Sequence, residues 1–191
     1  FLLVVSFPQK CPTKFLQNML YSINRNAIYF FLERKIPMSK IEEKLQELGL
    51  SLPTPPAKAG SYAPAKKFAQ GLYFISGCGP STGEPITGCL GKDVTAEQGY
   101  EYAKTSMLNV LAVLKREIGD LDKVKNVVKV TCFVASTPDF YAQPQVANGG
   151  TELLIQLFGE EVGTPSRSAV GVSALPLNMP VETEALFEVE E

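Results

Sequence analysis

The sequence contains no histidine among its 191 residues. This absence excludes Ser-His-Asp and Cys-His nucleophile systems, HExxH metal sites and histidine general bases, because each of them depends on an imidazole. Any catalytic chemistry must therefore use other groups.

Long hydrophobic runs are also missing. No stretch of about 18 apolar residues occurs, so we expect no membrane-spanning helix and no membrane partner. Residues 1–5 open the chain with an apolar patch, Phe-Leu-Leu-Val-Val, that is too short to span a bilayer.

Cysteine is scarce and has no metal-binding spacing. The four cysteines, Cys11, Cys78, Cys89 and Cys132, form no CxxC pair. This pattern predicts reduced thiols in an intracellular compartment, with neither a zinc site nor a disulfide framework. Cys132 lies in an apolar strand pattern and is expected in the core. For Cys78 and Cys89, in a Gly-rich loop, a reactive thiol and a small filler residue are both compatible with the sequence, and we favour the filler.

Acidic residues are almost absent from the first 37 positions. Residues 1–37 hold five Lys/Arg and one acid, against 13 and 19 in the remainder, which gives net charges of +4 and −6. We expect Met38 to be the functional start. Residues 1–37 are then either a targeting segment or extra sequence ahead of the start, and we favour the second because no Arg/Ser-rich amphipathic pattern is present. We accordingly expect a cytoplasmic protein, with organellar targeting as the alternative.

The length and composition suit one domain. The full sequence has 45% hydrophobic and 20% charged residues, which is enough to bury one ordinary core and too little chain for two domains. We assign that core to residues 38–191. We divide this domain into a helix with a Pro-rich connector, residues 38–59, and a core, residues 60–190.

Periodicity and turn residues give the expected elements. A short helix begins at Ser39, has the capping-box spacing to Glu42, and carries an apolar stripe of Ile41, Leu45 and Leu48. The other expected elements are strands at 66–70 and 72–76, a helix from Asp93 or Thr95 to Ile118, a strand at 126–134, a helix at 144–158, and strands at 167–174 and 181–190.

This order predicts an α+β fold with one mixed sheet and two helices on one face. The other face of the sheet would remain without helices. A sheet that is apolar on both sides must cover that face, and self-association is the simplest way to do so.

The Gly-rich loop from Gly77 to Gly91 resembles a nucleotide-binding loop only superficially. The third glycine, Gly83, comes one residue too late for GxGxxG, and the next helix begins more than ten residues downstream. We predict turn geometry here, and neither a cofactor nor a metal.

Several short motifs follow one another along residues 60–190. They are Gly60-Ser61-Tyr62, Ser76-Gly77, Asn148, Pro165-x-Arg167-Ser168, and Leu175-Pro176 followed by Val181-Glu182. In their order and spacing these motifs resemble those of the YjgF/RidA family of enamine/imine deaminases. The segment before them resembles an extension of a less-characterised branch.

The resemblance implies a chorismate-mutase-like fold, a homotrimer whose sheets form a central barrel, and active sites in the clefts between subunits. It also implies the substrates, which are reactive enamines or imines of the 2-aminoacrylate type that are hydrolysed to 2-keto acids and ammonia.

Two residues are expected to carry this chemistry. Arg167 can hold a substrate carboxylate by two parallel hydrogen bonds and so fix the adjacent C=N carbon. Glu182, on the neighbouring strand, can orient a water molecule and accept its proton. A protonated imine is already electrophilic, so a strong nucleophile is not needed.

The family motifs supply the supporting residues. Tyr62 should close the pocket, the backbone at Gly77 and Ala169 should line the carboxylate site, and Ser76 and Asn148 should shape its edge. Ala169 stands where relatives commonly have cysteine, and the loop after Gly77 also departs from the common pattern, which leaves the substrate size open.

Each residue also has a structural interpretation. Arg167 could pair with an acid or contact a subunit interface, Glu182 could belong to a solvated strand face, and Tyr62 and Asn148 could be a packed ring and a capping amide. Three functions remain: the deaminase, a non-catalytic trimeric binder of small carboxylic or keto acids, and an RNA-directed ribonuclease or translation inhibitor. The last is the weakest, because the net charge is negative and no basic stripe is present, so we expect no nucleic-acid partner.

Overall fold

The computed structural model describes residues 38–58 and 60–190. Residues 1–37, including Cys11, lie outside the described residues, so the interpretations of that segment remain predictions. Ser39–Glu191 forms one compact unit.

Five strands and four helices form this unit, with two short 3₁₀ segments. Their bounds are α2 (Lys40–Glu47), β1 (Ala65–Ala69), β2 (Leu72–Cys78), α3 (Ala96–Ile118), η1 (Leu121–Lys123), β3 (Val124–Ala135), α4 (Gln143–Phe158), α5 (Glu160–Gly163), β4 (Ser166–Val172), η2 (Pro176–Asn178) and β5 (Val181–Val189).

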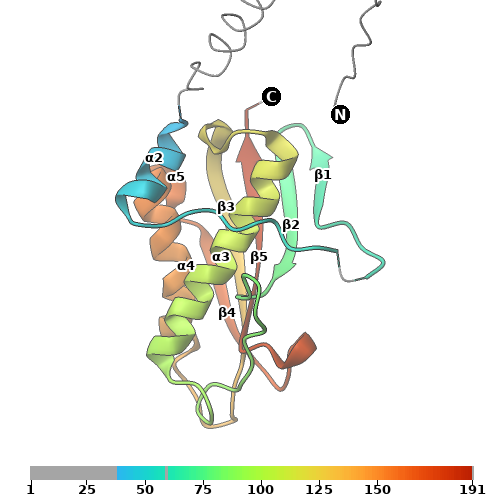
Figure 1. Ribbon diagram of the computed structural model, residues 1–191, viewed down its shortest axis with the longest axis vertical. Helices are drawn as coiled ribbons and strands as arrows, with labels where there is room; N and C mark the ends of the chain where they lie inside the picture. Colours follow the sequence, from blue (N-terminus) through green and yellow to red (C-terminus); the bar gives the residue numbers. More distant parts are fainter. Residues whose placement is uncertain (1–37, 59, 191) are drawn as a thin grey trace, which may run out of the picture. The chain divides into compact units, whose positions relative to one another are not determined.

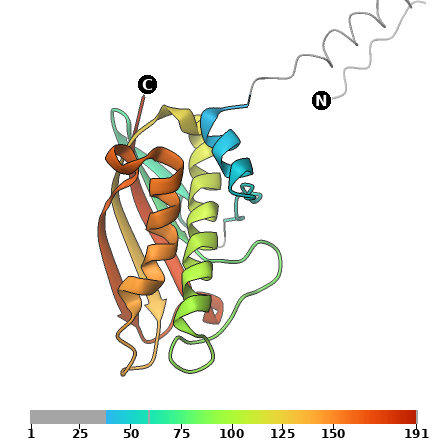
Figure 2. The same cartoon turned by 90° about the vertical axis from the view of Figure 1, so that its left-hand side faces the viewer.

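The strands form one mixed sheet with the order β1-β2-β5-β3-β4. Only the β3–β4 pair is parallel, and the other three pairs are antiparallel. Figure 1 shows α3 and α4 in front of the sheet, and Figure 2 shows both on the same side of it. None of the described helices covers the other face (Figure 2). The predicted α+β architecture with both helices on one face is therefore confirmed.

The long helix α3 begins and ends at the residues that the sequence indicated. Thr95 forms a complete capping box, because its Oγ1 accepts from the Gln98 N–H at 3.2 Å while its own N–H donates to Gln98 Oε1 at 2.9 Å. At the other end Gly119 has φ of 84°, a conformation that glycine adopts without strain.

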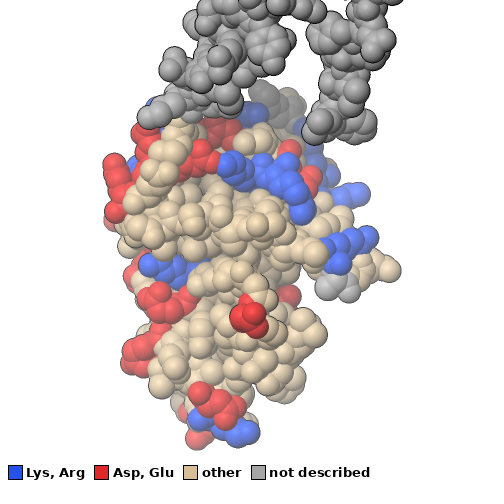
Figure 3. Space-filling model, viewed as in Figure 1, with Lys and Arg blue, Asp and Glu red and all other residues tan. Residues whose placement is uncertain are grey.

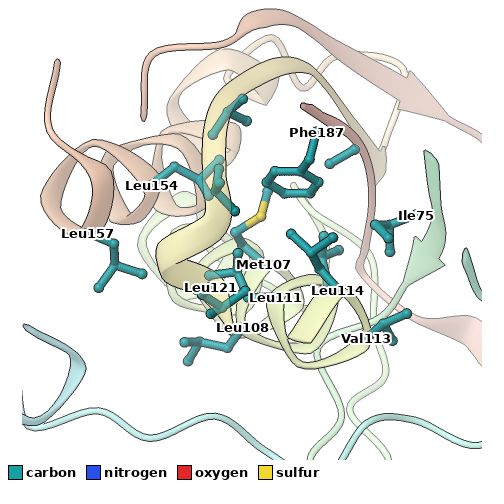
Figure 4. Close-up of a cluster of buried hydrophobic side chains, with 14 of the residues drawn as sticks. Ile75, Met107, Leu108, Leu111, Val113, Leu114, Leu121, Leu154, Leu157 and Phe187 are labelled. Carbon is teal, nitrogen blue, oxygen red and sulfur yellow. The ribbon is translucent and has the colours of Figure 1, made fainter. Parts of the chain in front are cut away.

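The core lies between the helices and the sheet. Met107 and Leu111 of α3, Leu154 of α4 and Phe187 of β5 all have at most 1% of their surface exposed. Figure 4 shows the Met107 side chain pointing towards the Phe187 ring, with Leu111 and Leu154 in the same cluster. Each fully buried side chain of this size stabilises the fold by about 1.5–3 kcal/mol.

Three details differ from the predictions. Leu48 is 42% exposed instead of completing the stripe of α2. Ser39 accepts the expected hydrogen bond from the Glu42 N–H, but the Glu42 carboxylate pairs with Lys115 instead of returning to Ser39, so the capping box is only half formed. The one-turn helix α5 was not predicted, because four residues are too few to show a period.

The face of the sheet away from the helices is mixed in character. Along β5 the buried residues alternate with Glu182, Glu184, Leu186 and Glu188, which are all partly exposed. Leu186 pairs in register with Phe74, which is 37% exposed. This face is thus less uniformly apolar than expected, although it does carry large apolar side chains.

Among the described residues, no helix is long and apolar enough to cross a membrane.

Candidate functional site

Four of the predicted site residues line one cavity. Tyr62, Ser76, Gly77 and Glu182 border a cavity of about 720 Å³ at the end of β2. Ser76 holds the preceding loop against this strand, because its Oγ donates to the Ala63 carbonyl at 2.7 Å and its N–H donates to the Pro64 carbonyl at 2.9 Å. These bonds place Tyr62 at the cavity.

Gly77 leaves open the space that the end of the Glu182 side chain occupies. A Cβ at Gly77 would lie 2.7 Å from Cδ of Glu182 and even closer to Oε1, a separation that real Cβ atoms do not adopt. The β2–β5 register is irregular between Ile75 and Cys78, next to this point. Such irregularities are common beside functional sites, where they redirect a side chain.

The environment of Glu182 favours its protonated form. Burial raises the pKa of Glu182 above its usual value, and the nearby Glu184 carboxylate raises the pKa further. A carboxyl with a raised pKa exchanges protons more readily near neutral pH, as a general acid or base requires.

Helix α3 anchors the loop that follows β2. Asn109 is 2% exposed, and its amide donates to the carbonyls of Gly79 and Ser81 at 2.9 Å each. Ser106 is fully buried and donates to the Cys78 carbonyl at 2.6 Å. Sequence reasoning missed both residues. Their signal was present, since two polar residues three positions apart on the buried stripe of a helix must find hydrogen-bond partners.

Arg167 lies apart from this cavity, against α4. Its Nη1 donates to Asn148 Oδ1 at 2.7 Å and to Thr151 Oγ1 at 3.1 Å. No described carboxylate lies within ion-pair distance of it, which does not support the interpretation that Arg167 pairs with an acid within the chain. Thr151 was also missed, although it lies one helical turn from Asn148.

Ala169 presents its backbone at an open edge. Strand β4 is the last in the sheet, and the Ser136 N–H donates to the Val172 carbonyl. Backbone groups alternate in direction along a strand, so those of Val172, Val170 and Ser168 face β3, and those of Ala169 face the free edge. The predicted role of the Ala169 N–H as a donor is therefore sterically open.

The two groups of residues cannot meet within one chain. Arg167 pairs with Val130 and Val130 with Ala185, so β3 separates β4 from β5 and the expectation that Glu182 lies on the neighbouring strand is wrong. Strand spacing and rise place the Cα atoms of Arg167 and Glu182 about 14 Å apart. Their side chains also lie on opposite faces, since Arg167 contacts α4 while Glu182 alternates with the buried residues of β5.

The cysteines of the core are poor nucleophiles. Burial raises the pKa of Cys78 to about 12, with Glu182 adding to the rise. Burial raises the pKa of Cys132 to about 11. Cys132 is in the core as predicted, but Cys78 ends β2 instead of lying in the loop. Across residues 38–58 and 60–190, no three His, Cys, Asp or Glu side chains are grouped to hold a metal ion.

Comparison with known proteins agrees with the motifs. The model of the family described as Endoribonuclease L-PSP matches residues 53–189. Protein TCP17 of Trypanosoma cruzi is 39% identical over 156 residues, which cover 81% of this chain and 97% of that protein. The crystal structure of Atu1372, a protein of unknown function from Agrobacterium tumefaciens, is 37% identical with a TM-score of 0.72, covering 79% of this chain and 94% of that one.

One relative is named for its activity. The 2-iminobutanoate/2-iminopropanoate deaminase of Dermatophagoides farinae is 28% identical over 143 residues, which cover 74% of this chain and 95% of that protein. The motifs, the fold and the family match agree with one another, and the chain belongs to the endoribonuclease L-PSP family, which is the YjgF/RidA family.

Proposed function

We propose that this protein hydrolyses reactive enamines and imines of the 2-aminoacrylate type to 2-keto acids and ammonia. The observation that carries the proposal is the state of Arg167, a permanent cation that α4 holds in place and that no described acid neutralises. Both of its hydrogen bonds use Nη1. Within the described residues, Arg167 Nη2 and Nε have no hydrogen-bond partner, so both are available to donate to the two oxygens of a substrate carboxylate.

The chemistry then needs one proton acceptor. The oxygen of a water molecule attacks the imine carbon, and its proton passes to Glu182. The nitrogen of the resulting carbinolamine takes this proton back from Glu182, and the C–N bond breaks with loss of ammonia. The carbinolamine hydroxyl gives its proton to Glu182 as the C=O bond of the keto acid forms, and Glu182 passes that proton to the departing ammonia. Glu182 suits these transfers because its raised pKa brings it closer to neutral pH.

We further propose that a second copy of the chain completes the site, within a homotrimer. Arg167, Asn148 and the Ala169 backbone lie at the open edge of β4, while Tyr62, Ser76, Gly77 and Glu182 border the cavity near β2. Opposite faces and the separation given above prevent one small substrate from touching both groups in one chain. Cyclic assembly would bring one group from each of two neighbours together.

The decisive experiment generates 2-aminoacrylate in place with a serine dehydratase and follows pyruvate formation. The wild type should accelerate it, and Arg167→Ala should abolish the acceleration. Arg167→Lys keeps the charge but loses the planar fork, so it should recover little activity. An unchanged rate with the wild-type protein would contradict the deaminase and favour the non-catalytic binder of carboxylic or keto acids, which uses the same arginine.

Mixed assemblies test the shared site. Arg167→Ala and Glu182→Ala subunits, each inactive alone, should regain activity when they are unfolded and refolded together, because some clefts then receive both intact residues. No recovery, or a solution mass of one subunit, would contradict the shared site.

The net charge of the domain does not support the RNA-directed alternative, since residues 38–191 hold 13 basic and 19 acidic residues.

A further inference from the structure

The segment between α2 and β1 forms one wall of the cavity. Residues 51–57, which we call the connector, cross α3 in Figure 1 and reach the cavity at Pro56 and Ala57. Earlier connector residues, Leu52, Pro53 and Pro55, lie beside Ala112 and Arg116 of α3. The connector thus follows the surface of α3 before it meets the cavity.

Helix α2 fixes the start of the connector. Both carboxylate oxygens of Asp122 accept backbone N–H groups, from Lys40 and Ile41, at 2.9 Å each. Lys44 Nζ donates to the Leu157 carbonyl at 2.7 Å, and Leu45 is 2% exposed. A helix held by polar and apolar contacts at once gives the connector a defined origin, and its three prolines limit its bending.

Leu177 and Met179 supply another apolar part of the cavity lining. Leu177 has φ of 56°, a left-handed conformation that costs energy for a leucine. The Met179 side chain occupies the space beside Gly79, where a Cβ would overlap its Sδ. Figure 3 shows a largely uncharged band across the middle of the helix-side face, where the connector crosses α3.

The cavity is larger than a two- or three-carbon imine needs. Its volume of about 720 Å³ falls within the roughly 300–1,000 Å³ of pockets that bury drug-sized ligands. Its polar groups include Glu182, Ser76 and Asn109, which lie on the strands and α3. The connector and residues 176–179, which we call the Leu177 loop, supply apolar surface.

We propose that the connector and the Leu177 loop form a specificity compartment for 2-imino acids with bulky apolar side chains, branched aliphatic or aromatic. The carbon that reacts lies beside Glu182, and the side chain extends between Ala57 and Leu177. This inference rests on the proposed function for the reaction, but the compartment itself can be tested by binding alone.

The binding test uses two stable 2-keto acids and calorimetry. The wild type should bind 4-methyl-2-oxopentanoate at least about tenfold more tightly than pyruvate, because each methylene in an apolar pocket is worth about 10- to 200-fold. Equal affinities, or tighter pyruvate binding, would overturn the compartment whether or not the protein is an enzyme. Tight binding without any imine hydrolysis would overturn the proposed function and leave the compartment standing.

A matched pair of variants locates the compartment. Ala57→Phe adds a ring at the cavity wall and should lower the preference for the larger keto acid at least about tenfold. Thr54→Phe adds the same ring at an exposed connector position outside the cavity and should leave the preference unchanged. An unchanged preference in Ala57→Phe, or an equal loss for both ligands, would overturn the assignment. The same ratio can be measured with imines that an amino-acid oxidase generates from leucine and alanine.

Discussion

The Glu182 carboxylate occupies the space that a side chain at Gly77 would fill. A Cβ on Gly77 would come within 2.7 Å of Glu182 Cδ, and the two residues lie on paired strands, β2 and β5. The glycine therefore sets the position of the proposed proton acceptor, in addition to any role of its backbone.

Gly77→Ala should displace Glu182 and weaken both stability and activity. The new Cβ meets the end of a flexible side chain that can move aside, so the loss in the free energy of unfolding should be about 1 kcal/mol, at the low end for overpacking. Urea denaturation measures this loss. The rate of aminoacrylate hydrolysis should fall with it, because a small misplacement of a catalytic group is costly.

A double-mutant cycle separates this clash from a general effect of alanine. In a Glu182→Ala background the Cβ meets no carboxylate, so Gly77→Ala should then have little effect on the free energy of unfolding. Equal losses in both backgrounds would show that the clash with Glu182 is not the cause.

Asn148→Asp should impair substrate binding more than the chemical step. The new carboxylate would pair with Arg167 at the position of the present 2.7 Å bond and compete with the substrate carboxylate. Charge-assisted bonds contribute about 1.5–3 kcal/mol, so KM should rise about tenfold or more. Thr151→Val removes only the weaker 3.1 Å bond and should have a smaller effect. A KM unchanged in Asn148→Asp would contradict the role of Arg167 as carboxylate clamp.

Much of the fold could be predicted because its signals are local. Thr95, Gly119 and the apolar stripe between them define α3 without reference to the rest of the chain. Strand order could not be predicted in the same way, because it depends on pairing between segments that are distant in sequence. The sequences of β4 and β5 do not indicate that β3 lies between them in the sheet. The prediction that Glu182 lies on the strand beside Arg167 was wrong for this reason.

The residues of the candidate site were predicted from family motifs, but the residues that hold them in place by hydrogen bonds were not. Ser106, Asn109 and Thr151 act through hydrogen bonds to groups remote in sequence. A polar residue in a buried stripe indicates that some partner exists, but only the three-dimensional structure identifies the Gly79 carbonyl or the Arg167 guanidinium as that partner.

The pH dependence of activity should respond to Glu184. If Glu182 accepts the proton, activity is lost as the pH falls through its pKa, which burial and the Glu184 charge both raise. The pH at which activity falls on the acid side should therefore lie above the usual pKa range of a glutamate. Glu184→Gln should move this acid limb of the pH profile to lower pH, because it removes one of the two causes of the raised pKa. Glu188→Gln, farther along the same face of β5, should leave the limb in place. The pH profile of kcat/KM is the measurement, and a limb unmoved in Glu184→Gln would count against Glu182 as the titrating group.

Thiol reactivity should separate the three described cysteines. At pH 8 a thiol with a pKa of about 12, as for Cys78, is ionised to about one part in ten thousand, and one with a pKa of about 11, as for Cys132, to about one part in a thousand. Both should therefore react slowly with Ellman's reagent while the fold persists. Cys89 is only half-buried and should react first. In a Cys11→Ser background, the number of thiols that react reports on these three cysteines alone. Rapid reaction of three thiols in the native protein would contradict the buried positions.

Docking of α2 should control the selectivity of the cavity without controlling the fold. Leu45→Ala removes a side chain that is 2% exposed, and such truncations cost about 2–5 kcal/mol. Because α2 lies at one end of the unit, much of this loss should appear as local opening of α2 and the connector, measured as faster amide hydrogen exchange there and unchanged exchange in β3. The preference for 4-methyl-2-oxopentanoate over pyruvate should fall, since the wall at Pro56 and Ala57 loses its fixed origin. Lys40→Ala leaves both backbone bonds to Asp122 intact and serves as the control. A global loss of protection, or a preference that survives the opening of α2, would contradict this coupling between the helix and the cavity.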